Sequence, residues 1–490
     1  MNDASAVAPQ PAAEITEWAG EADVVVIGYG IAGVCAAIEA ARAGADVLVL
    51  ERTGGWGGAA ALAGGFIYLG GGTDTQRALG FDDTVENMAA FLIAAIGPTA
   101  DQAKIADYCQ GSTEHHRWLV EAGVVFKDAF WGEPGWEPPH DEGLMYSGGE
   151  NAAPFNALVP PAPRGHVPQM ANKRTGEQGG GYMLMKPLVE TAEKLGVRAE
   201  YDTRLQRLIT DGTGRVVGVA ARRYGAEVTY RARRGVVLGT GSFAYNQDMV
   251  AQYAPQLVGR PAAAIEEHDG IGIRVGQGVG GQLDAMAASE VAFFGDPQLL
   301  ARGILVNGAG QRYIAEDTYP GRIGQATLLE QDNQAFLIID DDGHEAAAKT
   351  ETSTPFFRQQ PTWVAETVAE LESAMGLAEG ALQRTVAEYN ENAAAGVDPV
   401  QGKKPEWLTP IGSPLAGYDM RGFTAGFPLG GLRTDLDGRV LDAAGTPIPG
   451  LYAAGRCTAG ICTGGYASGA SLGDGSFYGR RAGVAAAADE

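Results

Sequence analysis

The feature that most constrains the fold is a group of three glycines between a predicted strand and a predicted helix. Residues 23–28 read Asp-Val-Val-Val-Ile-Gly, a β-branched run that is typical of a buried parallel strand. The motif Gly-Tyr-Gly-Ile-Ala-Gly occupies 28–33, and residues 31–43 follow a helical spacing of small and apolar side chains. A second strand over 46–50 completes the pattern of a βαβ unit.

The spacing of these glycines and of the next acidic residue predicts a dinucleotide-binding turn. Gly28 suits a tight bend, Gly30 lets the backbone approach a pyrophosphate at the helix N-terminus, and Gly33 allows the helix to pack closely on the strand. Glu51 ends the second strand, where a carboxylate can bind ribose hydroxyls. The chain is therefore expected to belong to the α/β class and to contain a Rossmann-like domain.

The segments that follow Glu51 favour FAD over NAD as the dinucleotide. A loop rich in glycine and alanine over 54–65 comes directly after the ribose carboxylate, where the longer cofactor needs backbone amides beside its diphosphate and flavin. Further glycine clusters lie at 235–241 and 464–483, and the second of these opens a predicted helix. The N-terminus of that helix can face the electron-rich edge of a flavin.

Composition and charge limit the number of domains and the classes of partner. A chain of 490 residues exceeds the ~250–300 residues at which a single core stops growing, so more than one domain is expected. The formal net charge of −24 argues against nucleic acid and against an anionic membrane, and it favours a neutral substrate over a dicarboxylate. No stretch approaches ~18 uninterrupted apolar residues, so no transmembrane segment is expected.

Cysteine and histidine positions give no indication of a metal site. The four cysteines show no zinc-like spacing, which favours a reduced, cytoplasmic protein. The six histidines, including the pair His115-His116, are also outside any metal spacing and are expected at the surface or at helix caps. Residues 1–20 lack a signal-peptide pattern and are expected to form a flexible tail.

The order of predicted elements indicates a Rossmann-like FAD-binding domain with an inserted α+β capping (catalytic) domain. Residues 21–280 are expected to form the first part of the FAD-binding domain, 281–413 the inserted domain, and 414–490 the C-terminal part of the FAD-binding domain. Residues 131–181 are rich in proline, glycine and asparagine and are expected to form surface or lid segments. The elements expected in the insertion are strands over 303–307 and 335–340 and helices over 361–374 and 378–395.

Over nearly the whole chain, these blocks resemble the flavoprotein superfamily of fumarate reductase and the 3-ketosteroid dehydrogenases. The resemblance implies an FAD-dependent oxidoreductase. Some members attach FAD covalently through a histidine in the loop after the acidic residue; residues 53–66 contain none, so noncovalent FAD is expected. The cofactor contacts expected from the motifs and the resemblance are Gly28, Gly30, Ile31, Ala32, Gly33, Glu51, Arg52, Gly57, Gly58, Ala59, Gly65, Leu205, Gly241, Gly455, Ser471 and Leu472.

Two segments depart from the fumarate and succinate branch of that superfamily. That branch holds two substrate carboxylates with arginines, one after a Thr-Thr pair and one in an Asn-Arg-Leu-Gly segment. The corresponding stretches here, 316–320 and 469–473, read Glu-Asp-Thr-Tyr-Pro and Gly-Ala-Ser-Leu-Gly. A carboxylate buried without partners is strongly disfavoured, so a dicarboxylate is a poor substrate. Arg322 is the remaining candidate for a substitute arginine.

The same two places resemble the 3-ketosteroid dehydrogenases. Tyr319 stands in the first, and Gly465-Tyr-Ala-Ser-Gly469 in the second. The 1,2-desaturating branch usually has a Gly-Pro-Gly run after the tyrosine and alanine. Ser468 is instead similar to the Δ4-(5α) branch, which oxidises the C4–C5 bond of 5α-reduced 3-ketones.

Such a desaturation needs a donor to the ketone, a base for the α-proton and a flavin to accept the hydride. The resemblance assigns Tyr466 to the C3 ketone, Ser468 to the C4 proton and Tyr319 to a proton relay. The expected function is FAD-dependent introduction of the C4–C5 double bond into a small apolar 3-ketosteroid, with an unidentified electron acceptor. The alternatives are a 3-ketosteroid 1-dehydrogenase, a flavin-dependent enone or fumarate-type reductase, and a noncatalytic flavoprotein that docks a partner.

Overall fold

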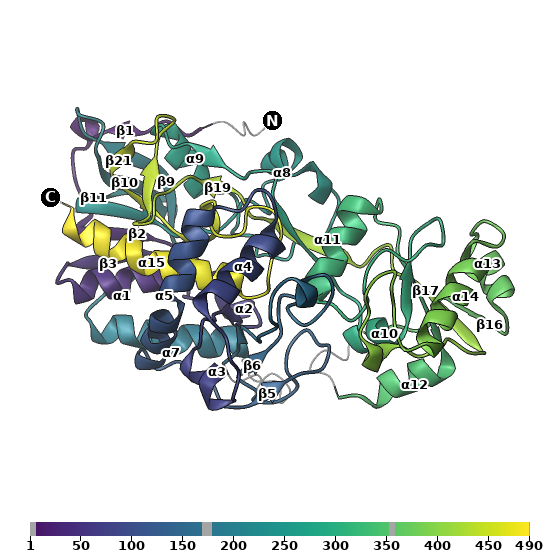
Figure 1. The fold of residues 1–490 in the computed structure, drawn as a ribbon. Coiled ribbons are helices and arrows are strands. Elements are labelled where there is room, and N and C mark those ends of the chain that lie inside the picture. The colour runs from purple at the N-terminus through teal and green to yellow at the C-terminus, as the bar shows by residue number, and fades with distance from the viewer. Residues whose placement is uncertain (1–5, 169–178, 352–357, 490) are drawn as a thin grey trace.

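The computed structural model describes residues 6–168, 179–351 and 358–489, and these form two lobes (Figure 1). The larger lobe is built on a nine-stranded sheet whose path runs β1-β9-β10-β11-β2-β3-β8, with β21 pairing β11 and β20 pairing β21. Its strands are β1 (Gln10–Pro11), β2 (Gly20–Ile27), β3 (Val47–Leu50), β8 (Arg198–Glu200), β9 (Thr203–Thr210), β10 (Val216–Arg223), β11 (Ala226–Leu238), β20 (Arg439–Leu441) and β21 (Pro447–Ala453).

The predicted βαβ unit lies at the centre of this sheet. β2 pairs in parallel with β3 on one side and with β11 on the other, and α1 (Ile31–Arg42) connects β2 to β3. All four residues of β3 are buried, as expected for a parallel strand covered on both faces. The other helices of the larger lobe are α2 (Gly58–Leu62), α3 (Asp74–Ala78), α4 (Val85–Ile96), α5 (Gln102–Glu121), α7 (Gly180–Lys194), α8 (Gln247–Tyr253), α9 (Ile271–Gly278) and α15 (Ala470–Ala488).

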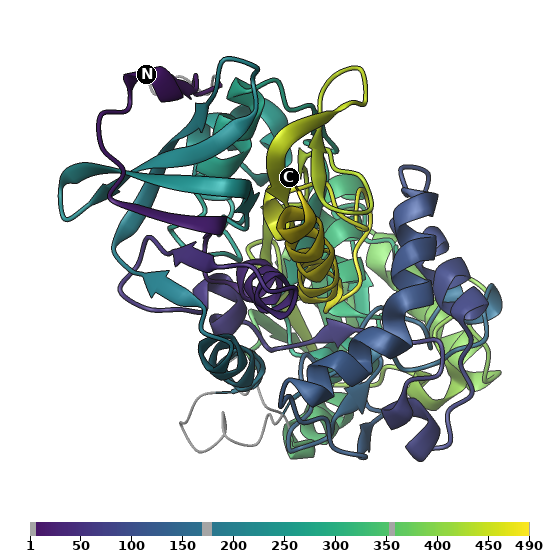
Figure 2. The same ribbon diagram turned by 90° about the vertical axis from the view of Figure 1, so that its left-hand side faces the viewer.

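Glycines allow the last helix, α15, to pack closely against the first helix, α1. Figure 2 shows α1 in purple and α15 in yellow side by side beneath the sheet. A Cβ atom on Gly479 would lie 2.5 Å from the carbonyl oxygen of Ala32, and one on Gly483 would lie 2.2 Å from that of Ala36. Only glycine allows the two helix backbones to approach this closely. The contact places the N-terminus of α15 beside the glycine motif that precedes α1.

The smaller lobe contains a four-stranded antiparallel sheet in the order β14-β15-β17-β16. Its strands are β14 (Ile304–Val306), β15 (Phe336–Asp340), β16 (Trp363–Ala365) and β17 (Leu415–Asp419). The expected division at residue 413 falls before β17, which pairs with both β15 and β16. The helices of this part of the chain are α10 (Pro297–Arg302), α11 (Pro320–Glu330), α12 (Asp341–Lys349), α13 (Val368–Met375) and α14 (Ala381–Ala394).

Antiparallel pairs join the two lobes. β13 (Ser289–Phe293) leads into the smaller lobe and pairs with β18 (Thr424–Pro428), which leads out of it. α11 packs against β13, and in Figure 1 it lies between the two lobes. The remaining short strands are β4 (Ile67–Tyr68), β5 (Phe130–Trp131), β6 (Leu144–Met145) and β7 (Gly165–His166), which form one sheet, and β12 (Leu283–Asp284) with β19 (Gly431–Leu432).

The segment expected to form a surface lid lies largely inside the larger lobe where it is described. Arg164 is fully buried, and its Nη2 and Nε atoms donate to the two carboxylate oxygens of Asp83 at 2.7 and 3.0 Å. A Cβ atom on Gly165 would lie 2.5 Å from Oγ of Ser147. The glycines of this segment therefore serve close interior packing, which composition does not distinguish from exposure. Residues 169–178 of the segment lie outside the described residues.

Two other expectations about local structure were wrong. The helix expected over 361–374 begins only at Val368, because Thr367 and Glu370 form a capping box there and β16 precedes it. The pair His115-His116 is buried rather than exposed, since Ser476 and Thr75 provide hydroxyl partners at 2.7 and 3.0 Å.

The N-terminal tail also differs from expectation in its described part. The backbone N–H of Val7 donates to Arg274 O at 3.0 Å, and β1 pairs in parallel with β9. Residues 1–5 lie outside the described residues. In the part of the chain that is described, no helix has both the length and the apolar character needed to cross a bilayer.

Candidate active site

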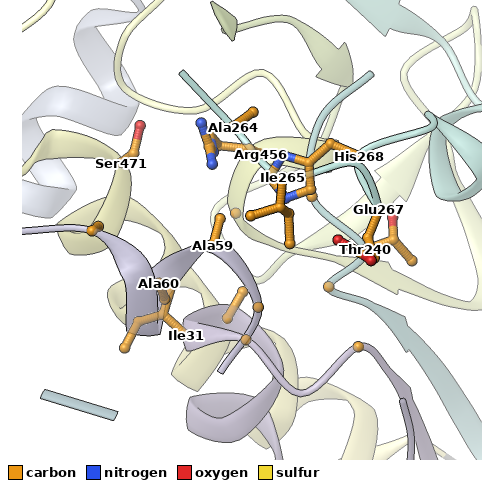
Figure 3. A pocket seen from close by; sticks show the side chains of 18 of the residues that line it. Ile31, Ala59, Ala60, Thr240, Ala264, Ile265, Glu267, His268, Arg456 and Ser471 are labelled. Atoms are coloured by element: carbon orange, nitrogen blue, oxygen red, sulfur yellow. The ribbon is translucent and has the colours of Figure 1, made fainter. Parts of the chain in front are cut away.

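A cavity of about 470 Å³ runs from the carboxyl ends of β2 and β3 to the N-terminus of α15. Its size is typical of a small-molecule site. In the close-up, Ser471 lies on one side and Thr240, Glu267 and His268 lie on the other, with Ala59 between them (Figure 3). The predicted residues that line it are Gly28, Gly30, Ile31, Ala32, Glu51, Arg52, Gly58, Ala59, Gly65, Leu205, Gly241, Gly455, Tyr466, Ser468, Ser471 and Leu472.

Gly33, Gly57 and Tyr319 are the predicted site residues that do not line this cavity. Gly33 lies beneath it, where a Cβ atom would be 1.9 Å from Gly28 O. Gly57 is the N-cap of α2, with φ at +111°. Tyr319 belongs to the smaller lobe. It lies beside Ser468, which does line the cavity, as described below.

The glycine motif fits the diphosphate of a dinucleotide. Gly28 has φ at +96°, and a Cβ atom there would lie 2.5 Å from Gly239 O. At Gly30 the nearest atom to an added Cβ is Gly57 O at 3.8 Å, so a side chain would project into the cavity. Gly30 is also the N-cap of α1 and offers no side-chain cap, which leaves the first amides of the helix to an anion.

Glu51 is held in the position expected for ribose binding. Its Oε2 accepts from the backbone N–H of Tyr29 at 2.8 Å, and its Oε1 accepts from the backbone N–H and the hydroxyl of Thr53, both at 2.8 Å. These contacts fix a buried carboxylate at the edge of the cavity. Its remaining lone pairs can accept from vicinal hydroxyls.

The opposite end of the cavity is formed by the loop before α15. Gly469, with φ at +96°, is the N-cap of α15 and offers no side-chain cap. Tyr466 is buried, and its hydroxyl oxygen accepts from the backbone N–H of Ser471 at 3.3 Å. Because the N-terminus of a helix carries partial positive charge, this contact polarises the phenol and leaves its proton free to donate. Burial raises the pKa of Tyr466, so the phenol stays protonated.

Ser468 is held by Ser147 of the larger lobe and lies beside Tyr319 of the smaller lobe. Its backbone N–H donates to Ser147 O at 2.9 Å, and the Ser147 hydroxyl donates back to Ser468 O at 2.9 Å. The Ser468 side chain lies beside the phenol of Tyr319 and lowers the pKa of that phenol, against the effect of burial. The structure thus brings Ser468, Tyr319 and the cavity together, although 149 residues separate the serine from the tyrosine.

Local geometry fixes Tyr319 in this position. Tyr319 is the N-cap of α11, and its ring folds back over Gly321, where a Cβ atom would lie 2.4 Å from the ring. Trp136 contacts the ring edge-on, with 6.4 Å between centroids. Burial raises the pKa of Tyr319 well above its usual value, with a further contribution from Glu290. Neither tyrosine is therefore a phenolate at neutral pH.

Three residues of the site were missed by the sequence motifs. Arg456 lines the cavity and stacks on Phe427, with 4.3 Å between its Cζ and the ring centroid. His268 also lines it; burial lowers the pKa of His268 to about 2, so the ring is neutral. Glu290 is buried and lies opposite Phe427 in the β13–β18 pair, although it does not line the cavity itself. Arg456 could have been inferred from its place after Gly455, but no local pattern marks His268 or Glu290.

Arg322 does not take the place of a carboxylate-binding arginine. Its Nη2 donates to Ala95 O at 2.5 Å, and its Nη1 donates to Gln325 Oε1 at 3.3 Å. Its guanidinium also stacks on Phe155, at 4.5 Å from the ring centroid. Both terminal nitrogens of the guanidinium are thus engaged within the protein, and its buried Nε has no hydrogen-bond partner among the described residues. The described residues contain no cluster of histidine, cysteine, aspartate and glutamate suited to a metal ion, and all four cysteines are buried free thiols, so Cys457 and Cys462 form no disulfide.

Comparison with known proteins agrees with this geometry. The family model described as FAD binding domain matches residues 23–472. A 3-oxo-5-alpha-steroid 4-dehydrogenase of Comamonas testosteroni is 28% identical, over 93% of this chain and 96% of its own. The 3-ketosteroid Δ1-dehydrogenase of Sterolibacterium denitrificans, solved with 1,4-androstadiene-3,17-dione, shares the fold with a TM-score of 0.75 at 22% identity, covering 96% of this chain and 100% of its own.

A crystal structure from Rhodococcus jostii RHA1 is much more similar. It is a 3-ketosteroid-Δ4-(5α)-dehydrogenase in complex with 4-androstene-3,17-dione, 69% identical to this chain, with a TM-score of 0.97. The match covers 98% of this chain and 100% of the Rhodococcus chain. The protein therefore belongs to the FAD binding domain family of flavoproteins and, within it, to the family of the 3-ketosteroid-Δ4-(5α)-dehydrogenases.

Proposed function

We propose that this protein oxidises the C4–C5 bond of 3-keto-5α-steroids. The observation that carries the proposal is the grouping of three hydroxyls, Tyr466, Ser468 and Tyr319, at the end of the cavity beside the N-terminus of α15. The 4-androstene-3,17-dione bound to the Rhodococcus relative is the product that such an oxidation forms from 5α-androstane-3,17-dione. Bound FAD supplies the acceptor for the hydride that leaves C5.

Tyr466 is assigned to the C3 ketone of the steroid. Its proton is free to donate, since its oxygen is the acceptor in the contact with the Ser471 amide. Removal of the C4 proton builds negative charge on the ketone oxygen. A donor placed in advance, in a buried site, stabilises that charge more than it stabilises the neutral ketone.

Ser468 is assigned to the C4 proton, with Tyr319 as its relay. A serine hydroxyl is too weak a base to act alone, so its own proton must leave as the C4 proton arrives. The phenol of Tyr319, which lies beside Ser468, provides that exit. Two hydrogen bonds with Ser147, one to its carbonyl oxygen and one from its hydroxyl, hold the backbone of Ser468 in place while this happens.

FAD is proposed to bind noncovalently, along the cavity. Gly28, Gly30 and the first turn of α1 hold the diphosphate, Glu51 holds the ribose, and the first turn of α15 faces the flavin. The yellow cofactor should then separate from the protein when the protein is precipitated with acid. Flavin that stays with the precipitate would contradict this. Glu51→Ala should lower FAD occupancy, and unchanged occupancy would count against the ribose assignment.

The remaining assignments concern domains and partners. We propose that the inserted domain begins near 281 and ends after β17, and that it acts as a cap that supplies Tyr319. The electron acceptor that reoxidises the flavin is unidentified. A cytoplasmic location is proposed because all four cysteines are buried free thiols.

Anaerobic reduction of the flavin tests the function directly. 5α-Androstane-3,17-dione should bleach the flavin absorbance of the purified protein, and succinate should leave it unchanged, since Arg322 is engaged within the protein. Bleaching by 4-androstene-3,17-dione in place of the 5α-steroid would indicate a 1-dehydrogenase instead. Bleaching by succinate would restore the fumarate-reductase alternative.

A further inference from the structure

One buried carboxyl group next to the site has no role in the mechanism above. Glu290 lies in the middle of β13, opposite Phe427 of β18, and only 3% of it is exposed. Its Oε2 atom has no hydrogen-bond partner among the described residues. Burying a carboxyl without satisfying both oxygens destabilises the folded protein, so the position is not explained by stability.

Three groups of the candidate site, Arg456, Tyr319 and Tyr466, interact electrostatically with Glu290. Arg456 is the positive charge that acts on it, but the guanidinium stacks on Phe427 and the two side chains form no ion pair. β13, which carries Glu290, packs against α11, and Tyr319 is the N-cap of α11. Glu290 is also the ionisable group that acts most strongly on the phenol of Tyr319. Glu290 also acts on two other buried groups, the thiol of Cys462 and the phenol of Tyr466.

The environment favours a carboxyl that can change its charge near neutral pH. Burial raises the pKa of Glu290 to about 8, and the charge of Arg456 opposes this only in part. A group with such a pKa, next to a tyrosine that remains protonated, can take up and release a proton during turnover. The relay of Ser468 and Tyr319 needs a group with this behaviour to accept the proton that leaves Tyr319.

We propose that Glu290 is the final proton acceptor of the relay that begins at Ser468 and passes through Tyr319. The inference rests on the proposed steroid oxidation. Glu290 acts through Tyr319 and contacts neither the steroid nor the cofactor. Its uncommitted Oε2 is the atom that receives the proton, directly or through a water molecule.

The proton balance closes with this residue. The C4–H bond breaks and its electron pair forms the new C4–C5 π bond, while a hydride leaves C5 for the oxidant that FAD supplies. The C4 proton goes to Oγ of Ser468, the Ser468 proton goes to Tyr319, and the Tyr319 proton goes to the Glu290 carboxylate. Glu290 then returns its proton to water before the next turnover. The relay therefore requires ionised Glu290 at its start.

The test is the pH dependence of flavin reduction in the FAD-loaded protein, measured anaerobically with 5α-androstane-3,17-dione on both sides of pH 8. The wild-type rate should rise with pH through an inflection near 8, as Glu290 ionises. Glu290→Gln should remove the inflection and lower the high-pH rate by ~10²-fold, the lower end of a general base's contribution. Glu290→Asp should restore an inflection.

Asp474→Asn is the matched control, because Asp474 is another buried carboxyl with a raised pKa, held by the backbone N–H of Ile461 at 3.0 Å. It should keep the inflection near 8. A Glu290→Gln enzyme with the wild-type rate and inflection would overturn the proposal, and so would loss of the inflection in Asp474→Asn.

A second measurement does not depend on activity or on a variant that folds. Infrared spectra of the wild-type protein should show the carbonyl stretch of a protonated buried carboxylic acid, which disappears as the pH passes 8. Absence of such a titrating band would overturn the proposal. Wild-type flavin that no 5α-steroid bleaches at any pH would overturn the proposed function and the relay together, whereas bleaching with an unchanged inflection in Glu290→Gln would overturn the relay alone.

Discussion

At the scale of single residues, the proposed roles separate ketone polarisation from proton removal. Tyr466 accepts from a helix N-terminal amide and so donates its own proton, whereas Ser468 faces Tyr319. Burial raises the pKa of both tyrosines, and we assign them different roles because their partners differ. Each role has its own kinetic consequence.

Replacing Tyr466 by phenylalanine tests the first role. The variant should reduce its flavin ~10²–10³-fold more slowly, which is the range for loss of one oxyanion donor. Affinity for the 4-ene product should change little, because a neutral ketone gains less from the donor than an enolate does. Stopped-flow flavin reduction and product titration measure the two effects, and a large loss of affinity with an unchanged rate would contradict the assignment.

A double-mutant comparison tests the second role. Ser468→Ala and Tyr319→Phe should each slow flavin reduction severely, and the double mutant should be scarcely slower than either single mutant, since residues that act as one unit are not additive. FAD content should stay normal in all three. Multiplying losses in the double mutant would show that the two hydroxyls act independently, and a wild-type rate for Ser468→Ala would indicate 1,2-desaturation.

At the scale of elements, the contact between α1 and α15 connects the two ends of the cofactor cavity. The glycines of α15 let its backbone rest on α1, and both helices begin at the cavity without a side-chain cap. The two positive helix ends are therefore positioned relative to each other by one interface. Close packing makes that interface sensitive to a single added methyl group.

Gly479→Ala measures this sensitivity. The new Cβ atom would lie 2.5 Å from Ala32 O, so the helices must separate, at a cost of ~1–3 kcal/mol. We expect a lower melting temperature and weaker FAD retention, measured by thermal unfolding and by the flavin-to-protein absorbance ratio. Val484→Ala, at a position on the same helix that is 47% exposed, is the control and should change neither. Equal behaviour of the two variants would contradict the packing argument.

At the scale of the whole molecule, buried ionisable groups link stability to pH in opposite directions. His166 is fully buried between Thr73 and the Arg164 carbonyl, and burial lowers its pKa to about 3. The folded protein keeps it neutral, while the unfolded chain protonates it below 6.5. Its contribution to stability is therefore present above pH 6.5 and lost as the pH falls. Glu290, whose pKa is raised, loses its contribution as the pH rises towards 8.

His166→Gln isolates the first of these effects. The variant should melt at a lower temperature than the wild type above pH 6.5, because a buried hydrogen-bonded ring is lost. The difference in melting temperature should shrink as the pH falls below 6.5, since only the wild type must keep a histidine neutral. A difference that stays constant with pH would show that His166 does not titrate between the folded and unfolded states.

Local patterns were sufficient for the dinucleotide-binding part of the molecule. The strand, the glycine motif, the helix and Glu51 lie within one short segment, and each has a backbone or hydrogen-bonding requirement that few residue types meet. Most predicted cofactor residues accordingly line the cavity, and the α/β fold with a second lobe is confirmed. Tyr319, Tyr466 and Ser468 were identified by resemblance, and their roles stay predictions.

What local patterns could not provide depends on contacts between distant segments. No sequence motif marks Glu290, His268 or the hydrogen bonds between Ser147 and Ser468. Glu290 lies in β13, His268 in the segment before α9 and Ser147 in the loop after β6. Each acquires its environment only when these segments pack around the cavity. Composition also does not show that the proline- and glycine-rich segment packs inside the larger lobe, since glycine serves tight interior packing as well as exposed turns. Burial, and the pKa shifts that follow from it, is a property of the assembled chain.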